Sequence, residues 1–328
     1  MIWKQPATLT GDVPLVSVFA SMRKILPVLT IVALSLAALG CGDKAPAVAT
    51  LEVTPHAVRL SYPEVRMLHL NWQPSAALEG STAQPLVFLH LRDAKNQVVR
   101  TFDHPFPQKW QEGTPVAYDT KIFQSLLAPP LPPGKYKLTA GLYEGKTRWP
   151  LGGLGEKVDK REYSAVDVEV PAGATGPSFA FSPTWLPLEE GGDRYVLARR
   201  WLNGSGVIGI RDVKETGAVW MLLRIPSGNE PNEQLQVQNG GVPSVLVRGN
   251  CGGAEVSLSG PGMHELEIPV EAVPANGVCR ILLTSNFTIT SSVTGQVRSV
   301  SLENAAWEPA SARAGAAAPA PASGAPGT

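Results

Sequence analysis

Short runs of alternating apolar and polar residues, separated by Pro and Gly turns, fill this chain from about residue 50 to residue 309. Residues 86–92 read LVFLHLR, so Val87, Leu89 and Leu91 share one face of an extended segment. A period of two residues is typical of strands that bury one face. The 32 glycines and 30 prolines supply turns and interrupt helices. The sequence therefore predicts an all-β fold.

The predicted strands fall into two groups. About seven between residues 50 and 172 indicate an Ig-like β-sandwich, and about eight between residues 178 and 309 indicate a jelly-roll-like β-sandwich. Residues 173–177 have the composition of a linker. Tyr136, which follows a Pro-Pro-Gly turn, is expected to hydrogen-bond a nearby loop through its hydroxyl, as in a tyrosine corner. The Ala/Pro-rich tail, residues 310–328, is expected to be disordered because it has too little apolar area to bury.

The N-terminal part has the layout of an export signal. Residues 22–40 combine a short basic start with an uncharged run of 15 residues, 25–39, which is shorter than the roughly 20 residues that a membrane-spanning helix needs. We interpret residues 1–21 as a mis-called leader ahead of a true start at Met22. An uncleaved anchor remains an alternative.

The end of this signal resembles that of a bacterial lipoprotein, because Gly40 precedes Cys41. The resemblance implies that Cys41 is lipidated, that residues 41–49 form a tether, and that the chain is held at the cell membrane or outer membrane, facing the periplasm or the cell exterior. It departs from the usual pattern in having Ala38 where Leu is preferred. The alternative is an ordinary signal peptide with a chance cysteine.

Two further cysteines, Cys251 and Cys279, form an even pair in the oxidising compartment that an export signal implies, so we expect a disulfide between them. The alternative is two free buried thiols. They make a poor zinc site, because no histidine lies at ligand spacing.

A second resemblance covers residues 86–151. The strand Val87 to Leu91, the loop residues Trp110 and Gly113, and the turn and strand at residues 131–151 resemble a β-sandwich domain appended to bacterial membrane glycosyltransferases. That domain also occurs in exported proteins of unassigned role. The resemblance implies a sandwich fold, an extracytoplasmic setting and a faint link to glycans. The compact Gly-to-Asp step of the family is longer here, from Gly113 to Asp119. The second domain resembles jelly-roll carbohydrate-binding modules in architecture alone.

Charge and motifs argue against several functions. The chain has 28 basic and 28 acidic residues, so no charge excess points to nucleic acid. Its histidines and carboxylates show no catalytic spacing, and it contains no nucleophile-elbow or phosphate-loop motif. We therefore expect no enzyme activity, no metal and no cofactor. For the metal, the alternative is a structural calcium ion held by loop oxygens, with Asp193 and Glu303 as candidate ligands.

Tryptophans in turns provide the candidate ligand site. A sugar ring presents an apolar face, so a glycan site needs an exposed indole beside polar side chains. Arg200, Trp201 and Asn203 have this mixture near one turn, and Asn286 is expected on the same rim. Trp110, in a Pro-rich loop, is the candidate of the first domain. The alternative for each tryptophan is core packing.

These observations together favour a membrane-anchored, non-catalytic binding or adaptor lipoprotein, whose ligand is an envelope glycan or another envelope protein. Two alternatives stay open. One is an enzyme that acts on polysaccharide, which would need two facing carboxyl groups in a cleft. The other is a structural spacer in an envelope protein assembly.

Overall fold

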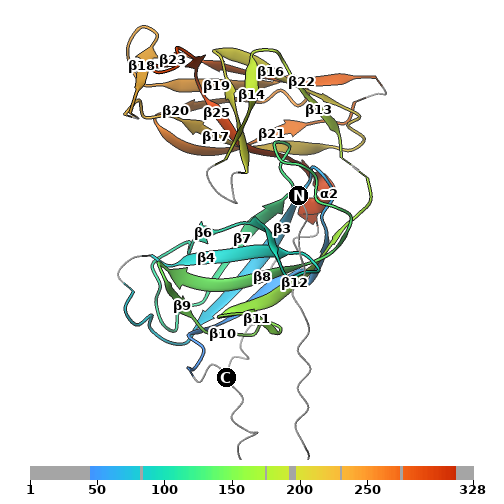
Figure 1. Cartoon of the computed structure of the whole chain (residues 1–328). Coiled ribbons are helices and arrows are strands. Elements are labelled where there is room, and N and C mark those ends of the chain that lie inside the picture. The colour runs from blue at the N-terminus through green and yellow to red at the C-terminus, as the bar shows by residue number, and fades with distance from the viewer. Residues whose placement is uncertain are drawn as a thin grey trace, which may run out of the picture. The chain divides into compact units, whose positions relative to one another are not determined.

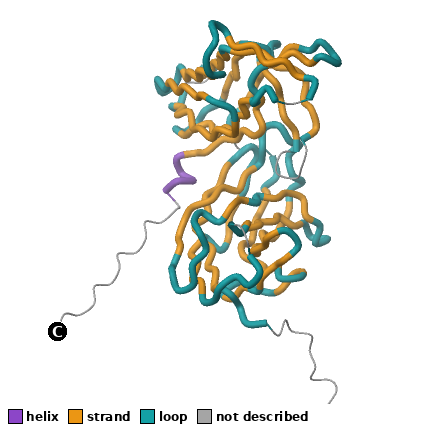
Figure 2. Tube along the Cα trace, turned by 90° about the vertical axis from the view of Figure 1, so that its left-hand side faces the viewer, coloured by secondary structure: helices purple, strands orange, loops and turns teal. Residues whose placement is uncertain are grey.

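The computed structural model describes residues 45–81, 84–173, 176–191, 197–229, 231–273 and 276–314. The predicted leader, signal peptide, Cys41, Asp193 and the end of the tail lie outside the described residues. Strands make up most of the described chain (Figure 2), and the all-β prediction is confirmed. Within these residues, no helix has the length and apolarity needed to cross a membrane.

Two sheets form the first sandwich. One has the strand order β10-β1-β3-β7, and the other has the order β11-β12-β8-β4-β5, with β2 paired to β12, β6 to β4 and β9 to β8. The strands β4, β8 and β12 run side by side in Figure 1. The strands of this sandwich are β1 (Ala49–Thr54), β2 (Ala57–Arg59), β3 (Val65–Pro74), β4 (Leu86–Arg92), β5 (Val98–Thr101), β6 (His104–Pro105), β7 (Val116–Phe123), β8 (Gly134–Glu144), β9 (Thr147–Trp149), β10 (Leu151–Gly152), β11 (Lys157–Asp159) and β12 (Glu162–Val170).

Three sheets form the second sandwich, with the orders β13-β16-β22-β19-β20, β14-β15-β25-β17-β21 and β18-β23-β24. Its elements are β13 (Ser178–Phe181), β14 (Trp185–Glu190), β15 (Ala198–Leu202), β16 (Ser205–Arg211), β17 (Gly217–Ile225), β18 (Glu233–Val237), β19 (Ser244–Gly249), β20 (Glu255–Ser259), β21 (Gly262–Val270), β22 (Val278–Ser285), β23 (Phe287–Ser291), β24 (Val297–Arg298), β25 (Ser301–Pro309) and α2 (Ala310–Ala314).

The alternation in β4 produces the predicted inner face, because Val87, Leu89 and Leu91 are all fully buried. The outer face of the same strand is covered as well. Phe88 is only 1% exposed, since the Arg148 guanidinium carbon lies 4.7 Å from its ring centroid. The opposite position on β8 must be glycine, because a Cβ on Gly141 would lie 2.0 Å from the Phe88 ring.

The predicted tyrosine corner is present. Tyr136 lies near the start of β8, and its hydroxyl donates to the carbonyl of Pro132 at 2.7 Å. This bond ties the turn before the strand to the strand itself, and it uses the polar end of a ring that is otherwise buried.

Each sandwich has its own apolar core, and residues from one also pack against the other. Trp220 and Ala306 of the second sandwich belong to the core of the first, and the rings of Phe123 and Trp220 are 4.6 Å apart. A backbone hydrogen bond from the Leu126 N–H to the carbonyl of Ala305 on β25, of 2.7 Å, also joins the two sandwiches. The sheets divide at the predicted linker, and the division of the chain into two domains stays a prediction.

Two details differ from the prediction. The described part of the second sandwich has 13 strands, β13 to β25, where about eight were predicted. The first five residues of the predicted disordered tail form α2, where the Ala310 N–H donates to the carbonyl of Thr216 at 3.0 Å. Alanine favours helix, and the preceding strand holds the start of this segment in place.

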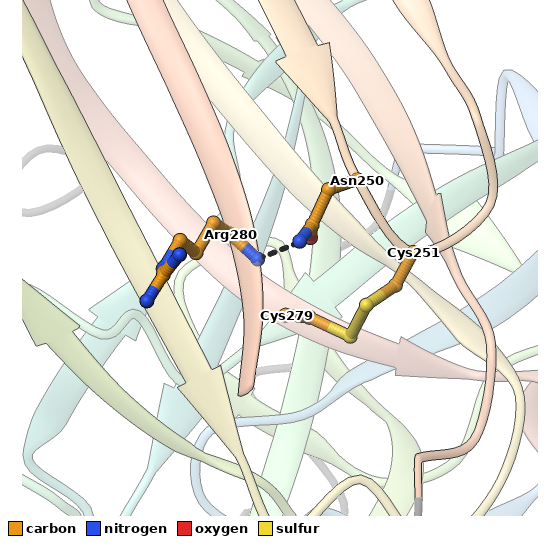
Figure 3. Close-up of a disulfide and its surroundings, with 4 residues drawn as sticks. All are labelled: Asn250, Cys251, Cys279 and Arg280. Atoms are coloured by element: carbon orange, nitrogen blue, oxygen red, sulfur yellow. Dashed lines mark hydrogen bonds between the residues drawn. A yellow bond between two sulfur atoms is a disulfide. The ribbon is translucent and has the colours of Figure 1, made fainter. Parts of the chain in front are cut away.

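The predicted disulfide between Cys251 and Cys279 is confirmed. It joins the loop after β19 to β22 (Figure 3). Asn250 holds the same loop, because its Oδ1 accepts from the Arg280 N–H at 2.6 Å and its own N–H donates to the Arg280 carbonyl at 3.1 Å. The covalent bond therefore closes a loop that hydrogen bonds already position.

Candidate functional site

Trp201, one of the predicted ligand-binding residues, lies on β15 and is 3% exposed. Its Nε1 donates to Glu189 Oε2 at 2.9 Å. The guanidinium carbon of Arg298 lies 4.1 Å from the centroid of its ring, a cation–π contact. The ring therefore has no exposed face on which a sugar could stack.

Arg200 is partly buried and points away from Trp201, as neighbours on a strand do. Its guanidinium carbon lies 4.5 Å from the ring centroid of Phe181, and burial lowers the pKa of this arginine. The side chain thus packs on an aromatic ring of its own sandwich, and the predicted grouping of Arg200 with Trp201 at one ligand surface does not form.

The turns that carry Asn203 and Asn286 lie together, because the Ser285 N–H donates to the carbonyl of Gly204 at 3.0 Å. Asn203 is exposed. The Asn286 side chain is used within the chain, since its Oδ1 accepts from the Ser244 N–H at 2.7 Å. Asn286 therefore has a structural role in joining two loops, and only Asn203 of this pair offers an exposed side chain.

Trp110, another of the predicted ligand-binding residues, lines a surface hollow. This hollow has a volume of about 480 Å³, and Trp110 is partly exposed in it. The polar residues of its lining are Ser81, Gln84, Lys109 and Glu112. A partly exposed indole among side chains that can donate and accept hydrogen bonds is the arrangement expected of a glycan site.

The indole of Trp110 is held in a fixed position. Its Nε1 donates to the carbonyl of Ala76 at 3.0 Å. Its ring centroid lies 5.0 Å from that of Phe106 and 6.3 Å from that of Trp72, both of which are buried. The loop itself is tied to β3, because the Gly113 N–H donates to the carbonyl of Pro74 at 2.9 Å. A rigid aromatic surface loses little side-chain entropy when a ligand binds.

A buried polar cluster on the outer face of β4, β8 and β12 was missed by the sequence reasoning. Glu162 is fully buried and accepts hydrogen bonds from Arg92 Nε at 2.6 Å and Thr139 Oγ1 at 2.5 Å. His90 Nδ1 lies 3.3 Å from the same carboxylate. Burial raises the pKa of Glu162, but the hydrogen bonds from His90, Arg92 and Thr139 outweigh it and hold the pKa well below its usual range. No local sequence signal marks this cluster, because its members come from three separate strands.

Two carboxylates that line one hollow, Asp103 and Asp119, each have a partner within the chain. Asp103 and Asp119 line a hollow of about 190 Å³, below the roughly 300 Å³ of typical small-molecule sites. Asp119 Oδ1 lies 2.8 Å from His69 Nδ1. Asp103 Oδ2 accepts from the Tyr143 hydroxyl at 3.1 Å, and burial raises the pKa of Asp103. This geometry gives the enzyme alternative no specific support.

The proposed calcium ligand Glu303 is 2% exposed. Its Oε1 accepts from Ser301 Oγ at 2.5 Å, and its Oε2 lies 3.5 Å from Arg199 Nε. Both carboxylate oxygens therefore have partners in the chain. Within the described part of the chain, no group of three or more His, Cys, Asp or Glu side chains is arranged to hold a metal ion.

Comparison with protein families finds no family model that matches this chain, and comparison with curated proteins finds no similar sequence.

Proposed function

We propose that this chain is a membrane-anchored extracytoplasmic lipoprotein that acts as a non-catalytic binding module, and that the hollow at Trp110 takes an envelope glycan. The observation that carries the proposal is the partly exposed indole of Trp110, held by Ala76, Phe106 and Trp72 and bordered by Gln84, Lys109 and Glu112. The hollow supports binding because one apolar surface and several polar groups face the same space.

Replacing Trp110 with alanine is expected to weaken glycan binding at least about tenfold, a loss of about 1.4 kcal/mol, because the ligand loses its apolar contact surface. The measurement is a titration of the full chain, purified in detergent, with cell-wall and exopolysaccharide fractions, followed by tryptophan fluorescence and calorimetry. Trp110→Phe keeps an aromatic ring and should retain most of the affinity.

Leu188→Ala serves as the control, because Leu188 is an exposed apolar residue of the second sandwich. It should leave the affinity unchanged. Since Trp110 also packs on Trp72, each variant is first checked for an unchanged unfolding transition at the titration temperature. Equal affinities of the wild type and of a folded Trp110→Ala variant would exclude the hollow as the glycan site.

The lipid anchor has a separate test. Cys41→Ser removes the thiol that would carry the lipid, so the variant should move from the membrane fraction to the soluble extracytoplasmic fraction. A lipoprotein holds the membrane through several acyl chains, and a protein without them has only weak attachment. Ser35→Cys combined with Cys41→Ser is a matched control that keeps a cysteine in the signal but not at the processing site. Retention of Cys41→Ser at the membrane would contradict the proposed anchor.

A further inference from the structure

A broad trough of about 920 Å³ lies on the outer face of the first sandwich, away from the Trp110 hollow. Its floor is formed by the start of β8, the end of β12 and the short strand β2. The turn at residues 93–96 and the strand β11 also border it. All of these segments belong to one sheet and its connections, so the trough is built by a single sandwich.

The floor carries charges in columns that follow the strands. Lys135 and Lys137 on β8 lie directly opposite Glu169 and Asp167 on β12, and Arg59 on β2 lies opposite Glu169. All five side chains are exposed. Lys137 forms an ion pair with Glu156. Among the described residues, the side chains of Lys135, Glu169 and Arg59 form no ion pair with one another, although they occupy neighbouring positions. Their charged groups are therefore available to a ligand.

The lining excludes several ligand classes. A phosphate or another polyanion would meet the carboxylates of Asp167 and Glu169, and a metal cation would meet Lys135 and Lys137. A glycan would lack a stacking surface, because the aromatic residue of the lining, Tyr136, is 8% exposed and its hydroxyl is bonded to Pro132. A lipid chain would have to desolvate the charged floor. A ligand with charges of both signs fits these columns.

The spacing favours an extended polypeptide. Side chains two residues apart on one strand are separated by roughly 6.7 Å, and an extended peptide presents its own side chains to one side with the same repeat. A peptide lying along β8 and β12 can therefore place an acidic side chain near Lys135 and basic ones near Asp167 and Glu169. We infer that the trough binds an extended segment of a partner protein that carries both acidic and basic side chains. This site is independent of the glycan site.

The test uses a fluorescein-labelled decapeptide in which threonine alternates with charged residues, and the charged residues alternate between glutamate and lysine. Anisotropy is measured with the full chain in detergent at low salt. We expect saturable binding that weakens as salt is added. Lys135→Glu and Glu169→Lys should each weaken it about tenfold, because the peptide uses both signs of charge. Lys214→Glu, the same charge reversal at an exposed position of the second sandwich and outside the lining, should leave the affinity unchanged.

The two reversals distinguish the ligand classes. If Lys135→Glu weakens binding while Glu169→Lys strengthens it, the trough selects anionic ligands and the inference is wrong. If Lys135→Glu strengthens binding while Glu169→Lys weakens it, the trough selects cationic ligands and the inference is also wrong. Absence of saturable binding, or displacement of the peptide by a neutral glycan, would also overturn the inference. Trp110→Ala should leave peptide binding intact, so the failure of one site is distinguishable from the failure of the other.

Discussion

Replacing Glu162 with glutamine is expected to lower the free energy of unfolding by about 3 to 5 kcal/mol, the usual effect of removing one partner from a buried ion pair. Glu162 is fully buried and lies 2.6 Å from Arg92 Nε. Glutamine has nearly the same shape, but it leaves the Arg92 guanidinium, whose side chain is 10% exposed, without its main counter-charge. Urea unfolding at pH 7, followed by tryptophan fluorescence, measures the difference.

The same variant has a predictable pH dependence. The pKa of Glu162 is lower in the folded chain than its ordinary value of 4.5. Above that value both states are ionised and the stabilisation is fully present. As the pH falls below it, the unfolded chain takes up a proton that the folded chain does not, so the stabilisation is lost progressively towards the lower folded pKa. The difference in free energy of unfolding between wild type and Glu162→Gln should therefore be largest at pH 7 and clearly smaller at pH 3.

Glu156→Gln is the matched control. Glu156 forms an ion pair with Lys137 at the surface, where both side chains are at least half exposed. Water and salt screen such a pair, so its loss should change the stability much less than Glu162→Gln does. Similar losses for the two variants, or a gap for Glu162→Gln that stays constant down to pH 3, would contradict the role assigned to the buried cluster.

Removal of the disulfide, by Cys251→Ala together with Cys279→Ala, is expected to cost about 3 to 4 kcal/mol in the chain-entropy model. The two cysteines are 28 residues apart, so the bond restricts a loop of that length in the unfolded chain. Asn250 and Arg280 keep their two hydrogen bonds beside it. The folded loop should therefore stay in place, and the effect should come mainly from the unfolded state.

Chemical denaturation with and without dithiothreitol measures this effect. The wild type under reducing conditions should unfold close to the double variant, and the double variant should not respond to the reductant. Two titratable thiols in wild-type protein that is denatured without reduction would show that the bond is absent in the native chain. An equal stability of wild type and double variant would contradict the expected size of the effect.

The sequence by itself determined the features that depend on neighbours along the chain. The period of two in residues 86–92 identifies the inner face of β4, because successive side chains of a strand point to opposite sides. The Pro-Pro-Gly turn before Tyr136 identifies the tyrosine corner, since donor and acceptor are four residues apart. The pairing of Cys251 with Cys279 could be predicted because they are the two cysteines that remain once Cys41 is assigned to the predicted lipid anchor.

Tertiary structure alone decided which tryptophan has an exposed surface. Trp201 and Trp110 both lie beside polar residues in the sequence, but Arg298, which is distant along the chain, covers the ring of Trp201. Trp110 instead packs against Trp72 in a T-shaped arrangement and keeps part of its indole open to a hollow. Local patterns specify the face of a strand. They do not specify which distant segment covers that face.

The buried cluster and the trough also depend on contacts between segments that are distant along the chain. Glu162 meets Arg92 and Thr139 because β12, β8 and β4 pair in one register, and the charged columns of the trough exist because Glu169 lies opposite both Lys135 and Arg59. A shift of one residue would turn these side chains to the other face of the sheet. Strand pairing between residues up to about 110 positions apart sets that register, so only the folded chain determines where these charges meet.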